Sequence, residues 1–194
     1  MVLEIVVDCY RLVGGQELHV EFSGGVAKRG SEVPITALLL NTVDLCTESK
    51  RCRVPYNEVW RPPVKNLLKF NVNGSVRGKP GPAGIGGVLR DFTGKFLCMF
   101  SLYVAVLDSN LAELLAIEKA CSLVVSNWAL YGLLIDIASD SKVAVYWIND
   151  EGICSLNYVN MVYDCRELIR SHGGISIYYI SRSMNSFANI LAKK

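Results

Sequence analysis

The sequence contains no apolar run long enough to cross a membrane. The stretch from Val33 to Leu40 is one of its longest, and it is far shorter than the roughly 20 residues that a transmembrane helix requires. A signal peptide is not indicated either, because Glu4 and Asp8 interrupt the apolar residues at the N-terminus. We therefore expect an intracellular, unsecreted protein with no membrane partner, and no feature favours the nucleus over the cytoplasm.

The cysteines and histidines form no pattern typical of a metal site or a disulfide framework. The seven cysteines are odd in number, widely scattered and contain no C-x-x-C pair. The two histidines, His19 and His172, have no cysteine or histidine partner at ligand spacing. We expect free thiols in a reducing compartment and no zinc site.

The sequence also lacks the strong positive charge of many nucleic-acid-binding proteins. Its 20 basic and 18 acidic side chains give a net charge of +2. Residues 64–194 are slightly more basic, with 13 basic and 10 acidic side chains, whereas residues 1–63 hold 7 and 8. Composition alone therefore permits nucleic-acid binding by the second part of the chain without indicating it.

Residues 1–62 lack both the two-residue period of a strand and the 3.6-residue period of a helix. We interpret them as an irregular N-terminal extension without a recognisable motif. Pro62 and Pro63 keep the residues before them out of the helical region, so the chain should be extended there. The 51% hydrophobic content of the whole chain suffices for a buried core, so we expect residues 63–194 to form one domain and the protein to be a monomer.

The pattern of residues 67–73 alternates between apolar and polar side chains, as in a half-buried strand. Further strands are predicted at 85–90, 96–104, 133–137 and 175–180, and helices at 110–126, 139–148, 157–171 and 186–193. The first three strands are expected to form an antiparallel meander. This order predicts an α/β fold with a five-stranded mixed sheet, three antiparallel strands plus parallel strands, flanked by helices.

Three polar residues fall at comparable places in these elements. Asn73 ends the first predicted strand, Asp140 follows the fourth, and Glu113 lies in the first turn of the longest helix. Ligands collect at the carboxyl ends of strands in sheets of this kind. Glu113 shares its helix face with apolar residues, and a buried carboxylate needs a partner, for which a metal ion is one candidate.

Each of these features also has a purely structural explanation. Asn73 and the glycine after it are a common two-residue hairpin turn. Asn110 and Glu113 also fit a capping box, in which Asn110 is the N-cap of the helix and the Glu113 side chain accepts from the backbone N–H of Asn110. The triplet Ser139-Asp140-Ser141 would likewise cap the next helix, where a carboxylate also suits the positive end, and Asn189 would be an ordinary surface residue of the last helix.

Six spaced motifs occur in order along residues 60–194. They are Trp60-x-Pro62-Pro63, residues 68–75 (LKFNVNGS), 81–91 (GPAGIGGVLRD), 108–117 (DSNLAELLAI), Ser139-Asp140-Ser141, and 185–193 (NSFANILAK). Each motif is weak alone, whereas their common order and spacing are specific. On these motifs the chain resembles the type 1 ribonuclease H family, in particular the retroelement-derived, reverse-transcriptase-associated branch that is abundant in plants.

The resemblance implies a ribonuclease H-like fold that hydrolyses the RNA strand of an RNA–DNA hybrid with two metal ions, Mg²⁺ or Mn²⁺. The family's four metal-binding acids map onto Asn73, Glu113, Asp140 and Asn189. Only Glu113 and Asp140 therefore remain as carboxylate ligands for a metal. The family's histidine, ten positions before the last acid, maps onto Tyr179.

The resemblance also implies nucleic-acid contacts for Gly74, Ser75 and Asn110. Asn110 would lie at the sugar edge of the hybrid, where 2′-hydroxyl groups distinguish RNA from DNA. The glutamate usual before the Ser-Asp-Ser triplet is Ala138 here. The expected partner is an RNA–DNA hybrid or another nucleic acid.

The two asparagines remove charge from the expected metal centre. An amide keeps one oxygen ligand but no formal charge, so the four positions carry −2 instead of −4. One lost unit-charge attraction at 4 Å is about 4 kcal/mol at an effective dielectric of 20, or roughly a thousandfold in rate. We therefore expect a weak or inactive copy of the enzyme. The alternative is a non-catalytic nucleic-acid-binding remnant or interaction module of a decayed retroelement.

Overall fold

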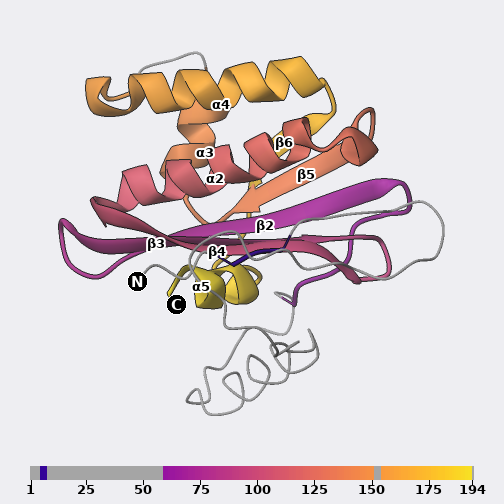
Figure 1. Cartoon of the computed structure of the whole chain (residues 1–194), viewed down its shortest axis with the longest axis horizontal. Coiled ribbons are helices and arrows are strands. Elements are labelled where there is room, and N and C mark those ends of the chain that lie inside the picture. The colour runs from indigo at the N-terminus through magenta and orange to yellow at the C-terminus, as the bar shows by residue number, and fades with distance from the viewer. Residues whose placement is uncertain (1–4, 8–58, 151–153, 194) are drawn as a thin grey trace, which may run out of the picture.

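The computed structural model describes residues 5–7, 59–150 and 154–193, which form one mixed sheet with helices on both faces (Figure 1). The strands are β1 (Ile5–Val7), β2 (Leu67–Val76), β3 (Gly81–Arg90), β4 (Phe96–Leu107), β5 (Leu134–Ser139) and β6 (Ile175–Tyr179). The helices are α2 (Ser109–Ser126), α3 (Lys142–Asn149), α4 (Val159–His172) and α5 (Ser186–Ala192), with short 3₁₀ turns at Trp128–Leu130 and Leu156–Tyr158. Most of the predicted N-terminal extension lies outside the described residues.

The strand order across the sheet is β1-β4-β3-β2-β5-β6. β2, β3 and β4 form the predicted antiparallel meander, and β5 and β6 join it in parallel. The predicted mixed sheet of five strands is confirmed, and the short strand β1 adds a sixth at the β4 edge, inside the segment predicted to be irregular. Among the described residues, no helix combines the length and apolarity that a membrane crossing would need.

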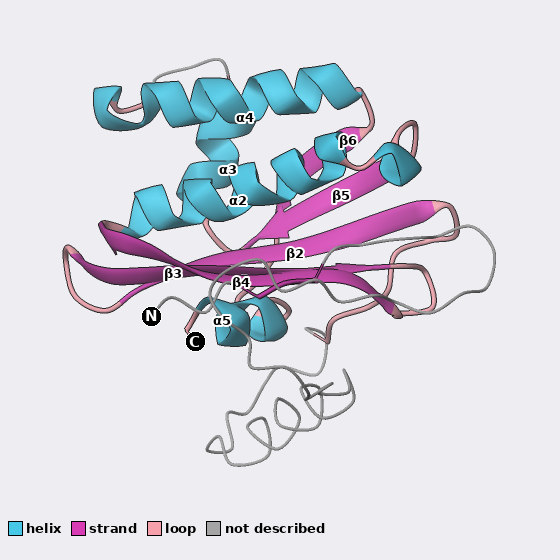
Figure 2. Cartoon of the chain, viewed as in Figure 1, coloured by secondary structure: helices cyan, strands magenta, loops and turns pink. Residues whose placement is uncertain are grey.

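The main core lies between the sheet and α2 (Figure 2). Phe70 and Val72 of β2 are fully buried against Leu114 and Ile117 of α2. Each such side chain contributes about 1.5–3 kcal/mol when it leaves water. This packing fixes the first turns of α2 above β2, which is the part of the helix that carries Glu113.

The helix α5 covers the opposite face of the sheet, below β2 and β3 in Figure 1. Gly86 of β3 allows this close approach, because a Cβ atom there would lie 2.5 Å from the backbone nitrogen of Ala192. The hydroxyl of Ser101 in β4 donates a hydrogen bond to the Leu191 carbonyl (2.7 Å), which ties α5 to the sheet. The last of the six motifs is thereby held against the strand that carries Asn73.

The hairpin interpretation of Asn73 and Gly74 is wrong. Asn73 lies inside β2, which continues to Val76 and stays paired with β3 as far as Ala83. Gly74 is required for a different reason, since a Cβ atom on it would lie 2.3 Å from the Ala112 carbonyl carbon in α2. The glycine therefore permits strand and helix to touch.

The capping box at Asn110 is wrong, whereas the predicted capping of the next helix by the triplet Ser139-Asp140-Ser141 is confirmed at Ser141. The N-cap of α2 is Asp108, whose Oδ1 accepts from the backbone N–H groups of Asn110 (2.9 Å) and Leu111 (3.1 Å). The N-cap of α3 is Ser141, so this helix begins three residues later than predicted and Asp140 precedes the cap. Glu113 and Asp140 are thus free of both capping roles.

Candidate active site

Glu113 lies against the exposed edge of β2 beyond the end of β5. Its Oε2 accepts a hydrogen bond from the backbone N–H of Gly74 (3.1 Å). That N–H is available because β5 stops at Ser139, which pairs with Val72, so β2 has no neighbour on this side from Asn73 onwards. The early end of β5 thus creates the position that the carboxyl group fills.

Burial raises the pKa of Glu113 to about 8. The Gly74 N–H, the Arg182 guanidinium and the Ser139 hydroxyl oppose this shift, whereas the negative charge of Asp140 reinforces it. Desolvation is the largest of these effects. Glu113 is therefore mainly protonated at neutral pH in the protein alone.

Asp140 is held by two side chains from the segment that follows β6. Its side chain is only 2% exposed. Its Oδ1 accepts from the Asn185 amide (2.8 Å) and its Oδ2 from the Arg182 Nε (3.1 Å), while Arg182 itself is 83% exposed. Both oxygens of this buried carboxylate are thus engaged by the protein's own donors.

Asn185 connects Asp140 to the sheet through a buried chain of side-chain hydrogen bonds. Its amide also donates to the Val72 carbonyl (2.8 Å), and its Oδ1 accepts from the Asn71 amide (3.3 Å). The Oδ1 of Asn71 accepts in turn from the indole N–H of Trp60 (2.9 Å). This network, from Trp60 through Asn71 and Asn185 to Asp140, fixes the orientation of the retained acid.

Asn73 and Asn189 lie on the α5 side of the sheet. Asn73 is 3% exposed and pairs across the sheet with Gly86, against which the end of α5 packs. Asn189 is half-buried one turn into α5, where its N–H donates to the Asn185 carbonyl (3.1 Å). The structure therefore places Glu113 on the α2 side, the two amides on the α5 side, and Asp140 just beyond the end of β5, close enough to Glu113 for its charge to raise the pKa of that carboxyl group.

The remaining predicted site residues surround this centre. Tyr179 ends β6 and is 42% exposed, with the Lys142 ammonium 4.9 Å from its ring centre. Ser75 follows Gly74 in β2 and is half-buried. Asn110 lies in the first turn of α2, beside the hydroxyl of Tyr158. These positions line the carboxyl-end rim without making a hydrogen bond to Asp140.

Sequence reasoning missed Arg182 and Asn185 as site residues. Asn185 opened the last motif but carried no predicted role, and Arg182 lay just outside it. The sequence did show an isolated arginine and an asparagine in a polar segment directly after an apolar strand. It could not show that both side chains bind Asp140, because this contact depends on how the turn after β6 folds back over that residue.

The donor set does not fit a centre for two divalent cations. Within the described part of the chain, no three His, Cys, Asp or Glu side chains cluster as a metal site would require. Glu113 holds a proton at neutral pH, and Asp140 is bonded by Arg182 and Asn185. A hard cation would have to displace both the proton and the guanidinium to reach these two carboxylates.

The chain is similar in sequence to known proteins. A family profile described as "Reverse transcriptase-like" matches residues 71–194. An Arabidopsis thaliana protein named as a ribonuclease H protein is 29% identical over 134 residues, which cover 69% of this chain and 21% of that protein. The chain thus spans about a fifth of the length of this relative.

Solved ribonuclease H structures superpose on the same domain. Ribonuclease H1 of the archaeon Halobacterium salinarum has a TM-score of 0.60 at 23% identity, covering 66% of this chain and 95% of its own. LC11-RNase H1 in complex with an RNA/DNA hybrid also has a TM-score of 0.60 at 23% identity, covering 65% and 94%. The fold is therefore ribonuclease H-like, and with the profile match over residues 71–194 the chain belongs to the reverse transcriptase-like family.

Proposed function

We propose that this domain binds nucleic acid as a ribonuclease H-like module and cleaves RNA–DNA hybrids weakly or not at all. The observation that carries the proposal is the state of Asp140. Its two oxygens are bonded to Arg182 and Asn185, while Asn73 and Asn189 stand at the two other expected acid positions. The scaffold of the family is present, and the negative charge of its reaction centre is largely gone.

The loss of charge affects hydrolysis more than binding. Two-metal hydrolysis needs cations at the attacking and leaving oxygens, and neutral amides hold such cations poorly. Affinity for nucleic acid comes mainly from basic side chains and phosphate groups, which do not require the missing acids. We expect Mg²⁺ or Mn²⁺ to bind weakly, because either ion must compete with Arg182 for Asp140.

A second candidate function is residual hybrid-specific ribonuclease activity. It is favoured by the retained pair of carboxyl groups, since Asp140 is close enough to Glu113 to raise its pKa. Tyr179 offers no imidazole to transfer a proton near neutral pH, and Asn189 no carboxylate. This candidate therefore predicts slow cleavage that depends on Glu113.

The deciding experiment compares cleavage of a labelled RNA–DNA hybrid by the unmodified protein and by the Asn73→Asp/Asn189→Asp variant, with Mg²⁺ and with Mn²⁺. We expect no cleavage by the first and a gain of at least about a hundredfold by the second. The same double variant with Glu113→Gln is the matched control and should be inactive. Robust cleavage by the unmodified protein, or failure to bind the hybrid at all, would contradict the proposal.

A further inference from the structure

We propose that Arg182 and Lys142 hold a phosphate group of a nucleic-acid strand directly, so that this site binds its ligand without a metal ion. The inference rests on the proposed nucleic-acid binding and adds its contact residues and its independence of metal. It also assigns Tyr179 a new role, as a surface on which a base stacks.

The topology brings the two cations to the same rim. β5 and β6 are parallel neighbours with Ser139 opposite Tyr179, so the segments that follow both strands lie side by side. The Ile180 N–H donates to the Ser139 carbonyl (2.9 Å), which extends this pairing past the strand ends. Lys142 comes from the first segment and Arg182 from the second, and both point to solvent at the end of the sheet.

The charge of this rim is opposite to that of an acidic metal centre. Arg182 uses its Nε for Asp140 and leaves the outer part of its guanidinium in solvent, with the side chain 83% exposed. In the part of the chain that the structure describes, Lys142 makes no ion pair, and its ammonium lies over the Tyr179 ring. One cation is thus bound to the shielded carboxylate and a second lies over Tyr179 at the same end of the sheet, an arrangement that attracts a phosphate.

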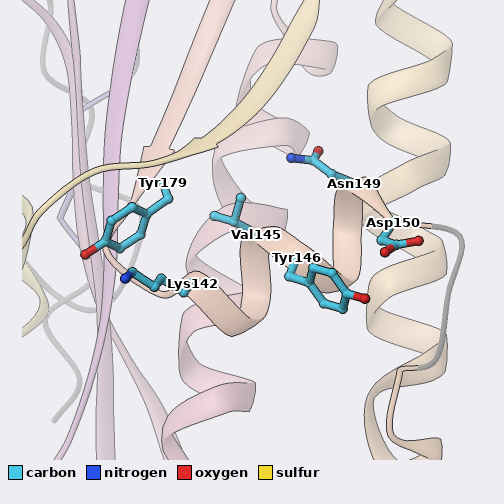
Figure 3. Close-up of a pocket in the computed structure, with 6 residues that line it drawn as sticks. All are labelled: Lys142, Val145, Tyr146, Asn149, Asp150 and Tyr179. Atoms are coloured by element: carbon cyan, nitrogen blue, oxygen red, sulfur yellow. The ribbon is translucent and has the colours of Figure 1, made fainter.

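The exposed aromatic ring of Tyr179 lies beside Lys142. Figure 3 shows Lys142 next to Tyr179 at one end of a hollow that runs along α3. The hollow has a volume of about 590 Å³, and its walls include Tyr146, which is 57% exposed, and Tyr179, which is 42% exposed. The acidic Asp150 lies at the other end of this hollow, so only the end at Lys142 and Tyr179 combines a cation with an aromatic face, the combination that binds a strand by phosphate contact and base stacking.

The replaced acids explain why no metal is needed. Four carboxylates would repel a phosphate until cations neutralised them, whereas Asn73 and Asn189 add no repulsion. Arg182 forms an ion pair with Asp140 and so neutralises a carboxylate that would otherwise need a metal cation. Added Mg²⁺ should therefore act only by screening, as any salt does.

The test measures binding of labelled single-stranded RNA and of an RNA–DNA hybrid in EDTA by fluorescence anisotropy. We expect Arg182→Gln and Lys142→Gln each to weaken binding of either ligand roughly fivefold to tenfold, and to lower the slope of log K against log salt by about one. Lys95→Gln is the matched control, because it removes one charge in the β3–β4 turn, beyond the opposite end of β2. Equal losses in all three variants would overturn the assignment.

A second pair of variants tests the stacking surface. Tyr179→Phe keeps the ring and should bind as the unmodified protein does, whereas Tyr179→Ala should lose about fivefold or more in affinity. A fluorescent adenine analogue in the RNA should be quenched on binding to the protein and less so on binding to the alanine variant. Unchanged affinity and quenching in Tyr179→Ala would show that no base stacks there.

The metal dependence separates this inference from the proposed function. Binding should be equal in EDTA and in Mg²⁺ at matched ionic strength, and the Asn73→Asp/Asn189→Asp variant should bind well only with Mg²⁺. If the unmodified protein binds the hybrid but requires Mg²⁺, this inference fails and the proposed binding function stands. If it binds neither ligand under any condition, the proposed function fails as well.

Discussion

At the scale of single residues, the surroundings of Glu113 determine its pKa. The carboxyl group is buried beside Asp140, and the Gly74 N–H, the Ser139 hydroxyl and the charge of Arg182 compensate only part of the lost hydration. These groups do not replace full hydration of a carboxylate, so the proton is retained. The stability of the fold should therefore depend on pH through this one side chain.

We predict that Glu113 lowers the stability of the protein as pH rises. Its folded pKa of about 8 lies above the ordinary value of 4.5, so the folded state binds the proton more tightly. Its contribution is fully present below pH 4.5 and is lost as pH rises to about 8, on the order of 4 kcal/mol over that window. Urea unfolding of the unmodified protein and Glu113→Gln across this range should show a flatter profile for the variant.

The control for this prediction is Glu167→Gln, which removes the same charge from an exposed position on α4. This change should leave the pH profile close to that of the unmodified protein. A profile that stays equally steep in Glu113→Gln would show that another group carries the pH dependence.

Some of the site residues could be predicted from the sequence and others could not. Glu113 and Asp140 were recognisable because motif spacing and helix periodicity depend on local sequence alone. Arg182 and Asn185 were not, since their contacts with Asp140 bridge more than 40 positions and depend on the turn after β6. Long-range hydrogen bonds of this kind leave no periodic trace in the sequence.

At the scale of elements, the contact between β2 and α2 organises the site. The strand passes so close beneath the first turn of the helix that Gly74 has no room for a side chain. The same close approach allows the backbone N–H of Gly74 to donate to the Glu113 carboxyl group. The order of elements was predicted correctly, because each has its own periodicity. Several bounds were not: β3 begins at Gly81, four residues before the predicted start at residue 85, because the extended β2 supplies its ladder partners.

We predict that Gly74→Ala destabilises the domain by about 1–3 kcal/mol or more. The new Cβ atom would lie 2.3 Å from the Ala112 carbonyl carbon and 2.5 Å from the Glu113 nitrogen, so α2 must move away from β2. Urea unfolding measures the loss of stability. Glu113 should also lose its hydrogen bond, which a changed pH profile of stability would reveal.

Gly132→Ala provides the comparison for this substitution. Gly132 has a φ of +76° but nothing within 4 Å of its would-be Cβ, so only backbone strain of about 1–2 kcal/mol is expected there. If Gly74→Ala costs less than Gly132→Ala, the close approach of strand and helix does not limit the fold as described.

At the scale of the whole molecule, the domain has a complete ribonuclease H-like scaffold, within which we propose that the reaction centre is incomplete. The core residues of β2 and α2 are fully buried, and the described part contains no buried side-chain polar atom without a hydrogen-bond partner. We therefore expect the stability of the protein not to depend on a bound metal. On the proposed mapping, Asn73 and Asn189 lower the charge of the site while the packing around it is intact.

We predict that Mg²⁺ does not raise the melting temperature of the unmodified protein. A ligand stabilises the folded state only when it occupies its site there. Mg²⁺ should not occupy this site, because Asp140 is already paired with Arg182. The Asn73→Asp/Asn189→Asp variant should melt at a lower temperature than the unmodified protein in EDTA and gain several degrees with Mg²⁺. Thermal scans with and without the ion measure both effects, and a clear Mg²⁺-induced rise in the unmodified protein would contradict the prediction.

The hydrogen bond from Trp60 to Asn71 has a consequence for where this domain starts. Trp60 precedes the boundary predicted at residue 63, yet its indole completes the buried chain that ends on Asp140, and its ring lies 4.3 Å from the guanidinium carbon of Arg90. A fragment that began at residue 63 would expose the Arg90 side chain and leave the Asn71 oxygen without its donor. The segment before the first strand of the meander is therefore a structural part of the site, and a boundary drawn for this domain belongs before Trp60.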